Sequence, residues 1–297
     1  MQVFPVSFSP TTYLSAIAAL SNVMIKRIIV PIDFSPASEQ ALKYAEGFAN
    51  QIEAKYIKVI HVFTPQTTAD AVTLPSVAQL MEERQLLLDE FLNEHPNEAS
   101  RVERQAELLL GFAADEIISQ SKSADLVIMG STGESGLIEQ VFGSVSSTVA
   151  LKSDCPVLLV PKDSVFSQYH NLVYASNNIS LSRRAVIKLM DFNELFHARV
   201  HFVHVALDEK DKFKGQREKL FAPLFNNPDP EFSFEFTEIE ADSIHEGLNH
   251  YVEEHPIDMA IMVTKQRTFW ERLFHRSATK ELTFNMKVPL MVFHLDD

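Results

Sequence analysis

The chain has 297 residues, of which 46% are hydrophobic, and carries a formal net charge of −14 with a single cysteine. This length predicts about two domains, and the composition is that of a globular protein in which each half buries a core of its own. The acidic balance argues against non-specific nucleic-acid binding, which needs a basic face, and no apolar run is long enough to span a membrane. The lone Cys155 leaves no partner for an internal disulfide and fits a reducing, cytoplasmic compartment.

Residues 1–23 differ from the rest of the chain. They contain no Lys or Arg, so they lack the basic start of a secretory signal, and their apolar stretch is interrupted by Ser15. We expect residues 1–23 to be a poorly ordered extension ahead of an alternative start at Met24, with a cleaved signal as the competing hypothesis.

From residue 27 onward, strand-like and helix-like patterns alternate. The expected strands of the first half are Arg27–Ile32, Tyr56–Val62, Val102–Leu110, Leu126–Met129 and Val157–Val160. The expected helices run from the Ser35-Pro36 cap to about residue 52, from beyond Pro75 to about residue 93, over Phe112–Ser121 and over Ser144–Leu151. Strands that alternate with helices imply an α/β fold with a doubly wound parallel sheet.

The second half repeats this order of elements. Its expected strands are Asn171–Ser176, His201–Val205, Phe232–Glu240, Asp258–Val263 and Lys287–Val292. Its expected helices are Leu181–Phe196 and one that Asp242 or Ser243 caps. We therefore predict a tandem duplication of Rossmann-like domains at 24–161 and 169–297, joined by a linker at 162–168. Chance alignment of two ordinary α/β domains is the alternative.

Glycines gather in one segment of the first half. Of the eight glycines in the chain, four lie between residues 130 and 143, where a strand pattern gives way to a helix pattern. Such a turn suits phosphate, because glycine lets the backbone approach an anion and the helix N-terminus adds partial positive charge. We interpret Gly130, Gly133 and Gly143 as phosphate contacts and Gly136 as a turn residue. The alternative is that all four only shape turns.

These motifs resemble those of the universal stress protein family. The family's spacing of glycine, two residues, glycine, nine residues and glycine followed by Ser or Thr is met by Gly130, Gly133 and Gly143-Ser144. The segments Val30–Ser35, His61-Val62 and Cys155–Pro161 are also similar to the family's. The resemblance covers residues 24–161 strongly and 169–296 as a degenerate copy. It implies a five-stranded parallel sheet and, in one branch, ATP or a related adenine nucleotide, which could bring Mg²⁺ with it.

The resemblance also implies which residues contact the nucleotide. They are Pro31, Ile32 and Asp33 at the first strand end, Val62 beside the adenine, Met129, Gly130 and Gly133 at the phosphate turn, and Gly143, Ser144, Val145 and Ser146 at the helix start. Asp33 would face the ribose, although it could serve only as a helix cap beside Ser35. Ligands of doubly wound sheets bind beyond the carboxyl ends of the strands, where the first and fourth strands diverge, and this rule points to the same residues.

No catalytic or metal-binding pattern stands out. The chain has neither a phosphate-loop lysine motif nor a nucleophile elbow, and we interpret Glu134 and Glu139 as a solvated loop face rather than as magnesium ligands. We predict no metal site built from protein ligands alone. His61 and His204 end equivalent strands, which favours a structural role, and Cys155 is expected to be buried.

The second copy has lost the glycine loop. Bulkier residues replace its three phosphate glycines, namely Val263, Gln266 and His275, and Ser176 takes the place of Asp33. We therefore predict no nucleotide in the second domain. Basic residues gather between positions 265 and 280, where they form either a surface patch that pairs with acidic residues or an anion site of another kind.

Together these expectations define a nucleotide-responsive regulator of the stress response. Its two domains would form an intramolecular pseudo-dimer, with further homodimerisation left open, and it would turn ATP over slowly if at all. The alternatives are a weak ATPase or phosphotransferase and a nucleotide-free scaffold. The expected partners are an adenine nucleotide and a protein that the sequence does not identify, with no nucleic acid and no membrane.

Overall fold

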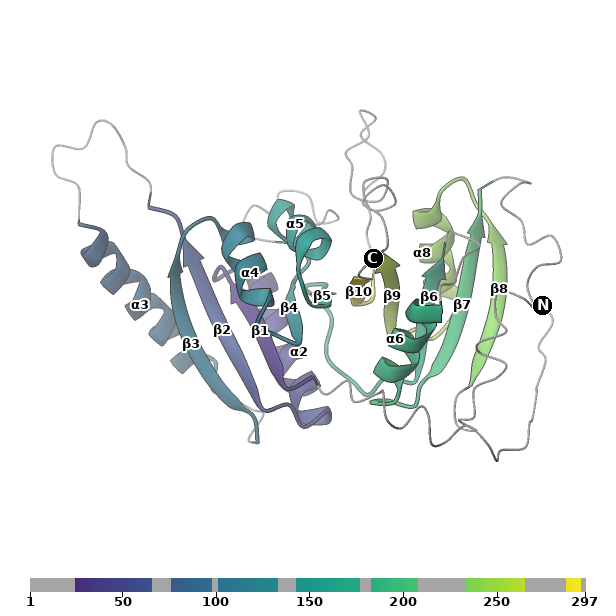
Figure 1. The fold of residues 1–297 in the computed structure, drawn as a ribbon, viewed down its shortest axis with the longest axis horizontal. Helices are drawn as coiled ribbons and strands as arrows, with labels where there is room; N and C mark the ends of the chain where they lie inside the picture. The colour runs from purple at the N-terminus through teal and green to yellow at the C-terminus, as the bar shows by residue number, and fades with distance from the viewer. Residues whose placement is uncertain are drawn as a thin grey trace. The chain divides into compact units, whose positions relative to one another are not determined.

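The computed structural model describes residues 25–65, 76–97, 101–132, 143–176, 183–207, 233–264 and 287–294. These residues form two compact units, one of residues 25–167 and one that begins at residue 168. Each unit has a parallel sheet with helices packed on it (Figure 1). The extension expected at residues 1–23 lies outside the described residues.

In the described part of the first unit, the sheet has five parallel strands. They are β1 (Arg27–Ile32), β2 (Tyr56–Phe63), β3 (Glu103–Leu110), β4 (Leu126–Gly130) and β5 (Val157–Val160). Their spatial order is β3-β2-β1-β4-β5, so the chain moves outward from β1 to β3 and then crosses to the other side of β1. The connecting helices are α2 (Pro36–Gln51), α3 (Val77–Glu94), α4 (Ala113–Ser121) and α5 (Ser144–Lys152). Helices α4 and α5 lie on the face nearer the viewer in Figure 1, and α2 lies behind the sheet.

The local sequence accounts for these elements. Strands β1, β4 and β5 are almost wholly buried apolar runs, as expected for strands covered on both faces. Helix α2 begins after Ser35, whose hydroxyl accepts a hydrogen bond of 3.2 Å from Ser38 N, and Pro36 follows. The cap predicted at Ser35 is therefore confirmed. Helix α3 begins with a capping box between Ser76 and Gln79.

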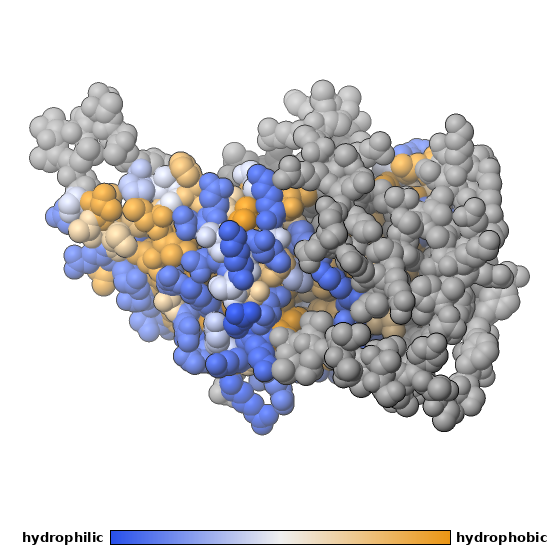
Figure 2. All heavy atoms as spheres, in the orientation of Figure 1, coloured by the Kyte–Doolittle hydropathy of each residue, from blue (hydrophilic) through white to orange (hydrophobic). Residues whose placement is uncertain are grey.

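Helix α3 packs on the sheet through a narrow apolar stripe. Within α3 only Leu88 and Phe91 are buried, whereas side chains such as Leu86 are exposed. Hydrophobic residues accordingly appear on the surface at the left of Figure 2, where Figure 1 places α3. The carboxyl end of α3 is held by Arg104 of β3, which donates to the backbone oxygens of Leu92 at 3.0 Å and His95 at 2.7 Å. A cation on the last carbonyls compensates for the sparse apolar contact.

The described part of the second unit repeats the pattern. Its strands are β6 (Asn171–Ser176), β7 (Arg199–Ala206), β8 (Phe234–Glu240), β9 (Met259–Thr264) and β10 (Leu290–His294), in the parallel order β10-β9-β6-β7-β8. Its helices are α6 (Arg183–Asn193) and α8 (Ile244–Glu254), the second capped by Ser243 as predicted. Among the described helices of the chain, none is long and apolar enough to cross a membrane.

The largest differences from the sequence expectation in the second unit are at α6 and β10, while β7 and β8 begin two residues away from it, at Arg199 and Phe234. Helix α6 ends at Asn193 rather than at residue 196, because the Asn193 side chain both donates to and accepts from the backbone of Ala198 and so closes the turn. Strand β10 begins at Leu290 rather than at residue 287, because Pro289 has no N–H to donate to a ladder. The Pro289 carbonyl still accepts from Ala260 N at 2.8 Å, so it marks the entrance of the strand.

The strand registers of the two units correspond. Ile32 pairs with His61 where β1 meets β2, and Ser176 pairs with His204 where β6 meets β7. Ser176 is therefore the counterpart of Ile32, and the expectation that it matches Asp33 was wrong by one position. A one-residue shift matters because successive strand residues point to opposite faces.

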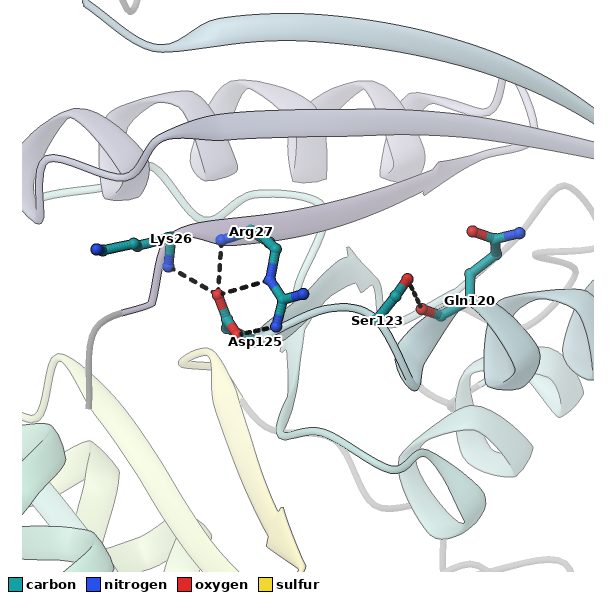
Figure 3. A network of polar contacts seen from close by, with 5 residues as sticks. All are labelled: Lys26, Arg27, Gln120, Ser123 and Asp125. Atoms are coloured by element: carbon teal, nitrogen blue, oxygen red, sulfur yellow. Dashed lines mark hydrogen bonds and ion pairs between the residues drawn. The ribbon is translucent and has the colours of Figure 1, made fainter. Parts of the chain in front are cut away.

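One polar contact also occurs in both units. Asp125 Oδ2 accepts from the backbone nitrogens of Lys26 at 3.0 Å and Arg27 at 2.9 Å, at the start of β1 (Figure 3). Asp258 Oδ2 accepts in the same way from His170 N at 2.6 Å, just before β6, and from Asn171 N at 2.8 Å, the first residue of β6. Among the described residues, only the first unit adds a side-chain partner, because the Arg27 guanidinium binds both Asp125 oxygens. The start of each central strand is thus fixed by an aspartate from the strand beside it.

Candidate functional site

The first unit holds a cavity at the carboxyl edge of its sheet. The cavity has a volume of about 420 Å³, which is in the usual range for small-molecule pockets. It lies where the chain reverses direction, between the ends of β1 and β4. The described residues that line it are Pro31, Ile32, Asp33, Ser38, Val62, Ala113, Ile117, Met129, Gly130, Thr132, Gly143, Ser144, Val145 and Ser146. All the residues predicted for nucleotide contact line it except Gly133, which lies outside the described residues.

Helix α5 presents its first turn to this cavity. Its N-cap is Gly143, with φ −61° and ψ 153°, and among the described residues no side chain caps the helix. The next backbone nitrogens are those of Ser144, Val145 and Ser146, and the following one, Ser147 N, donates to Gly143 O at 2.9 Å. An uncapped helix start concentrates unpaired N–H groups and partial positive charge, so this turn is suited to an anion.

The two sides of the cavity are joined by short polar contacts. The buried Ser146 hydroxyl donates to Gly130 O at 2.9 Å, which ties the first turn of α5 to the end of β4. Gly143 N donates to Ser131 O, and Ser131 N donates to Val160 O, both at 2.9 Å. The hydroxyl proton of Ser146 is therefore engaged within the protein.

Gly130 has a packing role that the sequence did not reveal. A Cβ atom at this position would lie 2.9 Å from Ala37 O and 3.2 Å from Ala37 Cβ, at the first turn of α2. Such distances are too short for a side chain, so a glycine is required for α2 to approach the end of β4. The phosphate interpretation and the packing interpretation of Gly130 are compatible.

Asp33 takes part in the start of α2 as well as in the cavity wall. Its Oδ1 accepts from Ser35 N at 3.1 Å and from the Ser35 hydroxyl at 2.5 Å, while its own N–H donates to the Ser38 hydroxyl at 3.3 Å. Its side chain is half-buried and is the single ionisable one among the described lining residues. Asp33 thus stabilises the start of α2, as the helix-cap alternative expected, and its contact with a ribose stays a prediction.

Val62 directs its backbone toward the cavity. Phe63 O accepts from Gly111 N at 3.1 Å on the β3 side, and successive residues of a parallel strand face opposite neighbours, so the N–H and C=O of Val62 point to the β1 side. Pairing of β1 with β2 ends at Ile32 and His61, one residue earlier. The Val62 backbone groups therefore extend past the end of β1, where a planar base could use them.

His61 serves the structure of the strand edge. Its Nδ1 donates to Ile32 O at 2.9 Å, and its ring packs against Phe34, with ring centroids 4.4 Å apart. Burial lowers the pKa of His61, so the ring is neutral at pH 7. No group of three His, Cys, Asp or Glu side chains in the described ranges could hold a metal ion. Cys155 is buried as predicted, and burial raises the pKa of its thiol to about 12.

Four lining residues were missed by sequence reasoning, namely Ser38, Ala113, Ile117 and Thr132. Ala113 and Ile117 belong to α4, which follows β3 at the same sheet edge. The order of the elements could have indicated α4, because the helix after β3 must cross the end of β1 to reach β4. The expected second-domain residues Gln266 and His275 and the basic 265–280 segment lie outside the described residues.

Comparison with known proteins gives a consistent result. Residues 24–161 match the model of the universal stress protein family. Universal stress protein MJ0531 of Methanocaldococcus jannaschii is 33% identical over 151 residues, covering 47% of this chain and 84% of that protein. Universal stress protein MJ0577 of the same organism is 30% identical over 159 residues, covering 48% of this chain and 98% of that protein. A universal stress protein from Archaeoglobus fulgidus has the same fold, with a TM-score of 0.71 over 93% of this chain and 99% of that chain at 18% identity.

Proposed function

The chain belongs to the universal stress protein family, and we propose that its first unit binds ATP or a related adenine nucleotide and acts as a nucleotide-responsive regulator without efficient turnover. The observation that carries the proposal is the uncapped first turn of α5, which opens on a cavity of about 420 Å³. An anion bound there would accept hydrogen bonds from the backbone N–H groups at the start of α5, which no described side chain caps.

The lining offers groups that suit both parts of a nucleotide. Gly143, Ser144 and Thr132 offer backbone and hydroxyl groups for phosphates, whereas Ile117 and Ala113 offer apolar surface for a base. The Val62 backbone supplies one donor and one acceptor to the same cavity. Adenine presents a neighbouring donor and acceptor on its edge, so this arrangement supports an adenine nucleotide.

The composition of the lining supports binding rather than rapid hydrolysis. Its described residues include one carboxylate, Asp33, and no lysine, arginine or histidine that could stabilise a leaving phosphate. Phosphoryl transfer depends on such charges or on a metal ion. A bound nucleotide would have to bring Mg²⁺ itself, with Asp33 as the nearest carboxylate among the lining residues.

For the second unit we retain the hypothesis of a duplicated and diverged copy. The corresponding registers and the paired roles of Asp125 and Asp258 support a common origin of residues 24–161 and 169–297. Strand β9 ends with Val263-Thr264, where β4 ends at Gly130. A β-branched side chain at that position would obstruct the close approach that Gly130 allows, so the second unit is assigned a structural or regulatory role.

Calorimetry on variants of two lining residues tests nucleotide binding. We expect Ala113→Leu, which adds bulk to the apolar part of the lining, to lose affinity for adenosine, ADP and ATP alike. Gly143→Ser should weaken ADP and ATP more than adenosine, because its hydroxyl would cap α5 in place of a phosphate. Ala114→Leu, on the same helix but outside the lining, is the matched control. Wild-type protein that binds none of the three ligands, with and without Mg²⁺, would refute the proposal.

A single-turnover assay tests the absence of efficient hydrolysis. With enzyme in excess over labelled ATP and Mg²⁺ present, we expect the nucleotide to be recovered intact over many minutes. Rapid release of phosphate that disappears in Ala113→Leu and persists in Ala114→Leu would instead assign an ATPase to this cavity.

A further inference from the structure

A cluster of titratable side chains lies inside the second unit, away from the proposed nucleotide site. His201 of β7 is buried, and its Nδ1 lies 2.7 Å from Glu235 Oε1 of β8 and 2.9 Å from the Tyr251 hydroxyl of α8. The Tyr251 hydroxyl in turn donates to Glu235 Oε1 at 3.2 Å. These three side chains connect two neighbouring strands to the carboxyl-terminal half of α8.

Other polar and charged groups near His201 also affect how readily its ring takes a second proton. Its Nε2 lies 3.2 Å from the Asn171 side-chain amide of β6, a group that can accept from a charged ring or, rotated, donate to a neutral one. The His255 ring at the end of α8 lies 6.1 Å from the His201 ring and stacks on Tyr251, and Arg199 on β7 adds a positive charge nearby. Of these groups, Glu235 is the one whose negative charge favours a charged ring.

The first unit has a lysine at the corresponding position. Ile29 pairs with Lys58 in the first sheet as Val173 pairs with His201 in the second. Lys58 Nζ donates to Gln120 Oε1 of α4 at 3.0 Å and forms an ion pair with Glu107 of β3. A lysine keeps its charge throughout the physiological pH range, whereas a histidine does not.

We propose that His201, Glu235 and Tyr251 form a proton-responsive tether, which holds α8 on its sheet at neutral pH and weakens as the pH falls toward 5. At neutral pH the ring donates through Nδ1 to Glu235, and Tyr251 donates to the same carboxylate. A second proton would place a positive charge in a buried site beside Arg199 and His255. The corresponding contact of α4 in the first unit would not respond in this way, because it depends on Lys58.

The sign of the effect follows from the surroundings of the ring. Burial lowers the pKa of His201, the Glu235 carboxylate opposes this shift, and Arg199 and His255 reinforce it. A histidine whose pKa is lower in the folded than in the unfolded chain stabilises the fold above about pH 6.5. That stabilisation is lost as the pH falls from there through the lower, native value, because the unfolded chain binds the proton more readily.

Hydrogen exchange of the full-length protein at pH 7.5 and pH 5.5, without nucleotide and corrected for the intrinsic pH dependence, tests the tether. We expect the amides of α8 to lose severalfold protection at the lower pH while those of α4 keep theirs. His201→Gln, which cannot be charged, should remove the pH difference. His250→Gln, an exposed histidine on the same helix, should leave it as in the wild type.

Three results would overturn the proposal. They are equal protection of α8 at the two pH values, a parallel loss in α4 and α8, and an unchanged difference in His201→Gln. Should His201→Gln fail to fold, the comparison of α8 with α4 in the wild-type protein decides the question by itself. The outcome is independent of whether the first unit binds a nucleotide.

Discussion

Replacing Gly130 by alanine would test why a glycine ends β4. The added Cβ would lie 2.9 Å from Ala37 O, 3.0 Å from the Ala37 carbonyl carbon and 3.2 Å from Ala37 Cβ. Ordinary van der Waals contact begins at 3.4 Å, so the strand and α2 would have to separate by roughly 0.5 Å, the difference between 3.4 and 2.9 Å. The atoms in the way belong mostly to the helix backbone, which cannot rotate aside as the end of a flexible side chain could.

The expected cost is that of overpacking a close-packed interior. Extra atoms in such sites destabilise by about 1–3 kcal/mol, which lowers the urea midpoint by roughly 1 M at an ordinary denaturant slope. Pulse proteolysis in urea, read by mass spectrometry on peptides of the first unit, measures this free energy without averaging over the two units. Nucleotide affinity should fall in parallel, because Ser146 of α5 is bonded to Gly130 O.

Gly143→Ser is the matched control for Gly130→Ala. The backbone at Gly143 has φ −61° and ψ 153°, which any residue adopts, so this variant should be no less stable than the wild type. If Gly130→Ala unfolds within about 0.5 kcal/mol of the wild type and only nucleotide binding is lost, then the packing argument is wrong. Gly130 would in that case be required by the ligand alone.

Three further outcomes are expected. Gly143→Ser should raise the stability of the first unit by roughly 0.3 kcal/mol through helix capping while it weakens binding of phosphate-bearing ligands, measured by urea unfolding and calorimetry. Asp125→Asn should cost about 1–3 kcal/mol at pH 7. Burial opposes ionisation of Asp125, but the Arg27 guanidinium and two backbone N–H groups outweigh it and hold its pKa below the ordinary value (Figure 3). Its contribution is therefore present above about pH 4 and lost on further acidification, so unfolding curves of variant and wild type should converge there. Cys155 should resist thiol reagents at pH 8 in the native protein and react only on unfolding, and rapid native labelling would contradict its burial.

Much of the fold could be predicted because its signals are local. Buried β-branched runs, the Ser35-Pro36 cap and the Ser243 cap each lie within a few residues of the element they define. The expected strands of the first half agree with the structure to within a residue at each end. The larger differences, at β10 and α6, arose where a proline or a side-chain hydrogen bond set a boundary that apolar periodicity does not express.

The site was predictable only in part, because some of its residues carry a local sequence signal and others do not. The glycine spacing indicated a strand, a turn and a helix start, and the structure brings Gly130 and Gly143 to one cavity with Asp33 and Val62. The contribution of α4 was missed, because Ala113 and Ile117 are unremarkable as sequence and line the cavity only through the order of the strands.

By itself the sequence determined the alternation of strands and helices, the likeness of the two halves and the segment proposed here to bind an anion. These properties depend on residue type, periodicity and spacing, which are local. The tertiary structure alone decided that Gly130 must be a glycine to admit Ala37, that Asp125 fixes the start of β1, and that His201 meets Glu235 and Tyr251. Each of these depends on contacts between residues tens of positions apart, and no local pattern records which distant side chain will be the neighbour.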